Sequence, residues 1–165
     1  IILCLLFFLI TRKSFSEYRF FAYARRHFVL LSFIVALVST LGSLYYSEIM
    51  GYAPCTLCWY QRIFMYPQAF LFAAAFFFRR EEYVMRFLAT SSLALSGIGL
   101  LLAGYHYLAQ IGAVSATCSV VGYSALCSEL FFVRYGYITI PLMAFTAFFL
   151  LILLGVNASR QQHSF

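Results

Sequence analysis

The sequence predicts an all-α integral membrane protein folded as a four-helix transmembrane bundle, and three observations lead to this fold class. Hydrophobic residues make up 64% of the 165 residues, while charged residues make up only 10%. Several apolar stretches are each close to the roughly 20 residues that cross a bilayer as a helix. The basic residues gather at the ends of these stretches, where membrane proteins place them. Four spans leave no room for a second, soluble domain.

The four predicted spans differ in how clearly the sequence marks them. Three are plainly apolar and cover residues 28–46, 87–108 and 137–156. The remaining span, residues 59–78, is second in chain order and less regular, because Arg62 lies near its start and Pro67 lies inside it. Its last part, residues 70–78, is an unbroken run of Phe, Ala and Leu, which supports the count of four.

The segment before the first span, residues 1–27, is predicted to lie at the cytoplasmic surface of the membrane. Aromatic and basic residues are interspersed over residues 11–27, as is typical of an interfacial amphipathic segment. Residues 1–10 are apolar but too short to span, and we interpret them as a fragment or an upstream extension in which Cys4 is a buried, lipid-facing thiol. The rest of the chain divides into a transmembrane domain, residues 28–157, and a cytoplasmic tail, residues 158–165.

The distribution of basic residues predicts that both termini face the cytoplasm. Lys and Arg near the ends of spans are retained on that side of the membrane. Nine of the eleven basic residues share one face: Arg12, Lys13, Arg19, Arg25, Arg26, Arg79, Arg80, Arg86 and Arg160. Only Arg62 and Arg134 fall on the opposite face. The net charge of +6 is thereby explained as topology, and it requires no nucleic-acid partner.

Four cysteines fall in the two connections that this topology places outside the cytoplasm. Cys55 and Cys58 lie in the first outer connection, and Cys118 and Cys127 lie in the second. The cytoplasmic connections contain no cysteine. Disulfides persist on the oxidising side of a membrane and are rare on the other side. The cysteines and the basic residues therefore predict the same orientation independently.

The most informative motif is the Cys-x-x-Cys pair formed by Cys55 and Cys58. Two thiols at this spacing can cycle between dithiol and disulfide, and a thiolate at a helix N-terminus is stabilised by the unpaired amides there. If a helix begins near Pro54, both cysteines and Arg62 occupy positions i, i+3 and i+7 on one face. Arg62 then adds a fixed positive charge beside the thiolate. The motif predicts a redox dithiol at the mouth of a membrane helix.

The electrons collected by such a dithiol need an acceptor, and the sequence shows no haem-attachment or flavin motif. A lipid-soluble acceptor at the membrane edge is the economical answer, with Arg62 and His106 as candidate contacts for its head group. Each candidate also has a structural interpretation. Arg62 alone could be a snorkelling anchor, His106 an interfacial residue, and the second cysteine pair a structural disulfide. The neighbouring aromatic residues are interpreted as belt residues: Trp59, Tyr60, Tyr105 and Tyr107.

Taken together, these motifs resemble the DsbB/BdbC family of disulfide-bond-formation proteins over roughly residues 28–157. The matching motifs are Pro-Cys-x-x-Cys-Trp-Tyr-Gln-Arg at 54–62, Met-Tyr-Pro at 65–67, Tyr-His-Tyr at 105–107, the cysteines Cys118 and Cys127, and Gly-Tyr-Ile-Thr-Ile-Pro at 136–141. The nine-residue interval from Cys118 to Cys127 is similar to the shorter BdbC-type members and departs from the longer enteric type.

The resemblance implies a quinone-dependent thiol oxidase of the bacterial cytoplasmic (inner) membrane, with ubiquinone or menaquinone as the acceptor. Its implied partner is a thioredoxin-fold, DsbA-like oxidase, which would form a mixed disulfide with Cys118. Cys127 would then exchange with Cys55, and Cys58 would pass the electrons to the quinone. All four cysteines are thus expected to be catalytic. Two further residues match family positions near the quinone: Arg62 and His106.

Two other interpretations stay open at this point. A vitamin K epoxide reductase-like enzyme also combines a loop pair with a Cys-x-x-Cys, although there the Cys-x-x-Cys usually follows the loop pair. A membrane scaffold could hold two structural disulfides or a four-cysteine zinc site. The wide spacing from Cys118 to Cys127 and the oxidising compartment argue against zinc, so no metal is predicted. Quinone reduction that requires a dithiol partner would distinguish the oxidase from the scaffold.

Overall fold

The computed structural model describes residues 27–77, 82–114 and 139–160, and every regular element in this part of the chain is helical. The elements are α3 (Phe28–Leu44), the π-helical turn η1 (Tyr45–Ile49), α4 (Thr56–Phe77), α5 (Glu82–Gln110) and α6 (Ile140–Arg160). The predicted interfacial segment and Cys4 lie outside the described residues, apart from His27.

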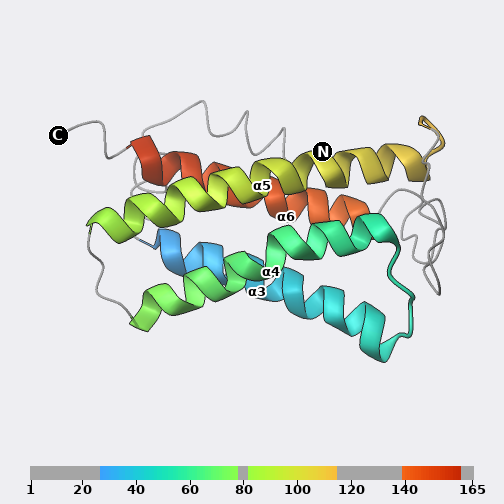
Figure 1. The fold of residues 1–165 in the computed structure, drawn as a ribbon, viewed down its shortest axis with the longest axis horizontal. Coiled ribbons are helices and arrows are strands. Elements are labelled where there is room, and N and C mark those ends of the chain that lie inside the picture. Colours follow the sequence, from blue (N-terminus) through green and yellow to red (C-terminus); the bar gives the residue numbers. More distant parts are fainter. Residues whose placement is uncertain (1–26, 78–81, 115–138, 161–165) are drawn as a thin grey trace, which may run out of the picture.

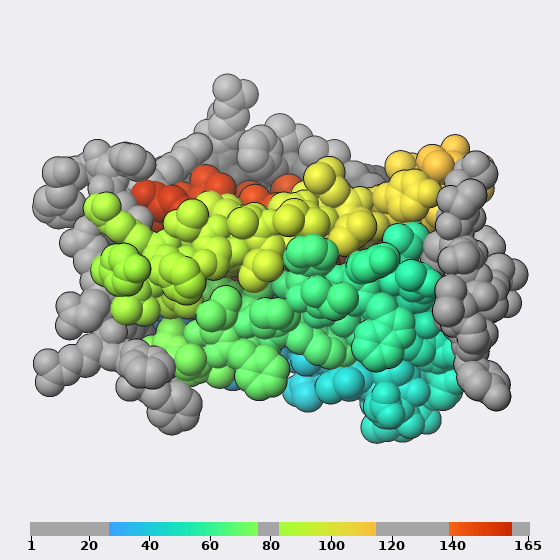
Figure 2. Space-filling view, viewed as in Figure 1, coloured from blue at the N-terminus to red at the C-terminus, as the bar shows by residue number. Residues whose placement is uncertain are grey.

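The four long helices form one bundle in which each helix packs against the next. Helix α3 packs against α4, α4 against α5, and α5 against α6, while α6 closes the ring against α3. Figure 1 shows α5 and α6 side by side, with α3 and α4 beneath them. The side chains of α4 and α5 meet over much of the face seen in Figure 2. This arrangement brings the start of α4 close to the end of α5, where the candidate site lies.

Three of the described helices are long and apolar enough to cross a membrane: Phe28–Ile49, Tyr83–Gln110 and Ile140–Ser159. Helix α4 has 22 residues but does not meet the same measure of apolar character. It carries the polar residues Gln61, Arg62 and Gln68, all of which are buried inside the bundle. The predicted helical membrane bundle is confirmed, and the crossing of the membrane by α4 itself stays a prediction.

The connection between α3 and α4 is shorter than the sequence predicted. Helix α3 ends at Leu44, but the turn Tyr45–Ile49 continues it past the predicted end at residue 46. Gly51 follows with a φ of 69°, a left-handed conformation that glycine adopts without a steric penalty. Helix α4 then begins at Thr56 instead of residue 59, so that Cys58 lies in its first turn and not in a loop.

The other two helices also differ from the predicted spans at their ends. Helix α5 begins at Glu82, earlier than the predicted residue 87, because backbone hydrogen bonding continues beyond the apolar stretch and includes Arg86. Helix α6 begins at Ile140 instead of residue 137, with Pro141 in its first turn, where a missing N–H removes no helical hydrogen bond. It ends at Arg160, inside the predicted tail.

A polar cluster and a close helix contact hold α4, α5 and α6 together. The Oε1 atom of Gln68 accepts hydrogen bonds from Ser92 Oγ at 2.9 Å and from Ser96 Oγ at 3.1 Å. Such bonds between buried polar groups join helices where water cannot compete. Between α5 and α6, a Cβ atom at Gly99 would collide with the ring of Phe148. The absence of a side chain at Gly99 therefore permits close packing of these two helices.

Candidate functional site

The two thiols of the Cys-x-x-Cys pair lie together at the N-terminus of α4. Cys55 directly precedes the helix, and Cys58 lies in its first turn. Both are free thiols, and their Sγ atoms are 3.0 Å apart. The backbone N–H of Cys58 donates to Cys55 Sγ at 3.3 Å, so the sulfur satisfies an amide that the helix itself leaves unpaired. The start of the helix thus stabilises negative charge on Cys55.

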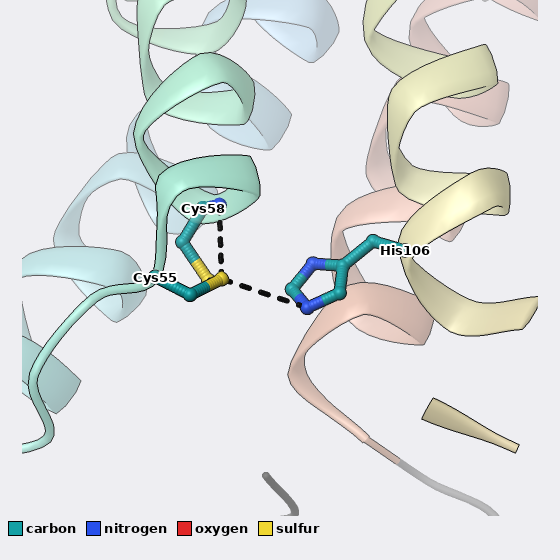
Figure 3. A group of neighbouring side chains, drawn as sticks. All are labelled: Cys55, Cys58 and His106. Atoms are coloured by element: carbon teal, nitrogen blue, oxygen red, sulfur yellow. Dashed lines mark hydrogen bonds between the residues drawn. The ribbon is translucent and has the colours of Figure 1, made fainter. Parts of the chain in front are cut away.

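His106 of α5 lies against this sulfur, as Figure 3 shows. Its Nε2 atom is 3.6 Å from Cys55 Sγ, and the His106 and Cys55 side chains are only 1% and 4% exposed. On the other side of the ring, Gln61 Nε2 lies 3.1 Å from His106 Nδ1. An amide NH₂ group only donates, so in the neutral form of the ring Nδ1 accepts from Gln61 and Nε2 carries the proton that faces the sulfur.

These contacts favour the thiolate form of Cys55, which lies in the connection between α3 and α4. The hydrogen bond to the Cys58 side chain is the largest cause that lowers the pKa of Cys55, to about 4. Burial opposes this change, while the hydrogen bond and charge of His106 and the Cys58 amide add to it. A low pKa of this kind is typical of reactive cysteines at helix N-termini.

Arg62 lies one turn after Cys58 and faces the interior of the bundle. The side chain is 8% exposed, so it is not a snorkelling anchor at the membrane surface. Its Nε donates to Ser43 Oγ at 3.0 Å, and its Nη2 donates to the Ser43 carbonyl oxygen at 3.1 Å. The guanidinium carbon also lies 5.2 Å from the ring centroid of Trp59. These contacts hold a positive charge beside the cysteines and fasten α4 to α3.

All four of these groups open onto one cavity with a volume of about 520 Å³. Its lining includes both cysteines, Arg62 and His106, together with apolar residues of α3 and α6: Ile34, Val35, Val38, Met143, Ala147 and Leu150. Residues 34 and 43 of α3 are separated by about 14 Å along the helix, at 1.5 Å per residue. The cavity therefore runs from the polar cysteine end into an apolar part of the bundle.

The structure brings together four of the six site residues that the sequence predicted: Cys55, Cys58, Arg62 and His106. The other two, Cys118 and Cys127, lie outside the described residues. The sequence analysis missed Gln61, although a polar residue three positions after Cys58 on a membrane helix was a usable signal. It also missed Ser43, which no sequence pattern distinguishes from other serines in apolar helices. The two cysteine Sγ atoms and the nearest ring nitrogen of His106, which are the atoms that could bind a metal ion, all lie within 4.8 Å of one another.

Comparison with known proteins finds a family model and several relatives. Residues 25–158 match the model described as "Disulfide bond formation protein DsbB". A "Probable disulfide formation protein" of Oceanobacillus iheyensis is 38% identical over 138 residues, covering 81% of this chain and 90% of that protein. "Disulfide bond formation protein C" of Bacillus subtilis is 38% identical over 137 residues, covering 76% of this chain and 88% of that protein. No solved structure is significantly similar to the chain.

Proposed function

This chain belongs to the DsbB family of disulfide bond formation proteins, and on that premise we propose that it is a membrane thiol:quinone oxidoreductase. Membership supports a thiol oxidase role for a membrane protein. The quinone acceptor and the partner protein go beyond family membership and are our proposal. The observation that carries the proposal is a shared cavity, which joins a Cys-x-x-Cys dithiol to a buried cation and to an apolar interior.

The cavity has the properties that a quinone requires. Its volume of about 520 Å³ is in the range of small-molecule sites, which run from about 300 to 1,000 Å³. Arg62 supplies hydrogen-bond donors for a ring oxygen, His106 can donate from Nε2 when its contact with Cys55 opens, and the apolar walls from α3 and α6 suit an isoprenoid tail. When bound, a quinone takes two electrons and two protons and becomes a quinol. The fit supports ubiquinone and menaquinone equally.

The residues around the dithiol control its protons and its charge. On oxidation, Cys55 and Cys58 lose two protons and two electrons and form one S–S bond. His106 lies within hydrogen-bond reach of the Cys55 sulfur and can donate to the thiolate that forms when the bond opens. Arg62 stabilises negative charge that develops beside Cys58 during the transfer. Cys58 is the more exposed of the two thiols, which suits a role as the residue that delivers the electrons.

Upstream of this dithiol, we assign Cys118 and Cys127 to the exchange with a partner protein. The partner is a thioredoxin-fold, DsbA-like oxidase, whose thiolate attacks Cys118 of a Cys118–Cys127 disulfide, forms a mixed disulfide with Cys118 and releases Cys127 as a thiolate. The Cys127 thiolate then attacks Cys55 of the Cys55–Cys58 disulfide and releases Cys58 as a thiolate. When the partner's second thiol displaces Cys118, Cys118 restores its bond to Cys127 and leaves Cys55 and Cys58 as the dithiol that reduces the quinone. Because the Cys55 sulfur is buried beside His106, this exchange requires their contact to open. The assignment places the cysteine connections outside the cytoplasmic membrane, with both termini in the cytoplasm.

The test is quinone reduction by the detergent-solubilised protein, followed optically, with a reduced thioredoxin-fold oxidase as the electron donor. Ubiquinone and menaquinone are supplied in separate reactions. We expect turnover in the parent protein and none in a Cys58→Ser variant. If correctly folded protein reduces neither quinone, the proposed acceptor is wrong, and a scaffold with structural disulfides becomes the better interpretation.

A further inference from the structure

We propose that the reduced protein binds one thiophilic metal ion, such as Zn²⁺, between Cys55, Cys58 and His106, and that this ion blocks the dithiol. The spacing from Cys118 to Cys127 and the oxidising compartment argued against a zinc site built from four cysteines, but a site with one histidine does not need the second cysteine pair. The structure supplies that histidine from α5. This site does not depend on the proposed quinone, since it uses only the reduced thiols and the imidazole.

The three ligand atoms are already close to the spacing of a tetrahedral site. Cys55 Sγ lies 3.0 Å from Cys58 Sγ and 3.6 Å from His106 Nε2, and all three atoms are within 4.8 Å of one another. Zinc lies about 2.3 Å from sulfur and about 2.0–2.1 Å from nitrogen, so neighbouring tetrahedral ligands are separated by about 3.4–3.8 Å. Side-chain rotations that move each cysteine sulfur by less than about 1 Å would reach this spacing.

The chemistry of the donors also selects this class of metal. Thiolate sulfur and imidazole nitrogen suit Zn²⁺ and Cu⁺, whereas oxygen ligands suit Mg²⁺ and Ca²⁺. Two thiolates neutralise a divalent ion, which reduces the cost of burying it. Three protein ligands leave a fourth position, and all three line the same cavity as Arg62. That position admits water or a small anion, as in zinc sites that keep an open coordination position.

Gln61 can support the histidine in the metal-bound state as well as in the free state. When a metal occupies Nε2, the ring proton moves to Nδ1 and needs an acceptor. Gln61 lies 3.1 Å from Nδ1, and rotation of its amide by half a turn presents the carbonyl oxygen in place of the NH₂ group. The same side chain therefore orients His106 in both states.

Metal binding and oxidation of the dithiol exclude each other at this site. The ion needs both sulfurs as thiolates, whereas the disulfide has no thiolate to offer. Metal should therefore bind the reduced protein, leave it on oxidation, and inhibit turnover while it is bound. Metal binding can therefore be compared between the reduced and the oxidised form of the same protein.

The test uses the full chain with Cys4, Cys118 and Cys127 replaced by serine, so that only the proposed ligands carry thiols. The protein is reduced with a phosphine, exchanged into detergent buffer, and titrated with Zn²⁺ against a chromophoric chelator. We expect one equivalent bound to the reduced protein and none to the oxidised protein. Co²⁺ should give the intense visible absorption of a tetrahedral thiolate site. Equal binding to both redox forms would overturn the proposal.

A His106→Gln variant tests the third ligand, and Tyr105→Phe is its neighbour control on α5. Because loss of even a supporting residue typically weakens metal binding by about 10- to 100-fold, loss of this ligand should weaken it by about 100-fold or more. The control should bind as the parent does. A His106→Cys variant should restore binding with a stronger thiolate band, which guards against misfolding of the first variant. Unchanged affinity in a folded His106→Gln variant would reduce the site to a simple dithiol and refute the proposal.

Discussion

Replacing Arg62 by alanine should impair the use of quinone far more than the use of the partner protein. The guanidinium is fixed by two hydrogen bonds to Ser43, of 3.0 and 3.1 Å, and lies in the wall of the cavity beside Cys58. A hydrogen bond to a charged group contributes about 1.5–3 kcal/mol. Since 1.36 kcal/mol corresponds to tenfold, the apparent KM for quinone should rise by about 10- to 150-fold.

The Ser43→Ala variant is the matched control for this change. It removes the hydroxyl that accepts from Arg62 Nε but keeps the backbone carbonyl that accepts from Nη2. Arg62 therefore retains its charge and one of its two contacts. The lost bond positions Arg62 but does not touch the quinone, so the KM for quinone should rise much less than in the Arg62→Ala variant.

The assay measures initial rates with quinone varied at saturating partner, and then with partner varied at saturating quinone. Titration of free thiols and the helical circular dichroism of each variant show that the protein remains folded. Equal increases in both KM values would mean that Arg62 acts only by fastening α4 to α3. An effect of Ser43→Ala as large as that of Arg62→Ala would lead to the same conclusion, because the charge itself would then not matter.

Three further predictions address the fold and the cysteine relay. Gln68→Leu should lower the stability of the bundle by about 1 kcal/mol, since interhelical hydrogen bonds in membranes average about 0.6 kcal/mol; unchanged thermal unfolding would contradict a stabilising role. Gly99→Leu should destabilise the protein by about 1–3 kcal/mol or more through its collision with Phe148, whereas Gly97→Leu, with open space around its Cβ, should be tolerated. Similar melting temperatures for the two glycine variants would refute the packing argument. Cys118→Ala should abolish oxidation of the partner while the Cys-x-x-Cys dithiol still reacts with quinone, and normal partner turnover would remove Cys118 from the relay.

The main features of the fold were predictable because they depend on local composition and periodicity. Apolar runs of the length of a bilayer predicted the helices, and the differences at their ends are a few residues. The shared face of Cys55, Cys58 and Arg62 also followed from helical periodicity once a helix was expected to begin near Pro54. The exact ends were less predictable, because hydrogen bonding in α5 continues through charged residues that composition assigned to a connection.

The sequence by itself determined the class of protein, the positions of its helices and the dithiol at the start of one of them. Only the tertiary structure decided that His106 of α5 meets the Cys55 sulfur, that Gln61 binds the far side of that ring, and that Ser43 holds Arg62 inward. The physical reason is that helical periodicity fixes which side chains share a face, whereas the contacts between faces depend on how all the helices pack together. Close packing at Gly99 and the hydrogen bonds of Gln68 contribute to that arrangement. Contacts of this kind join different helices, so the sequence pattern of one helix does not predict them.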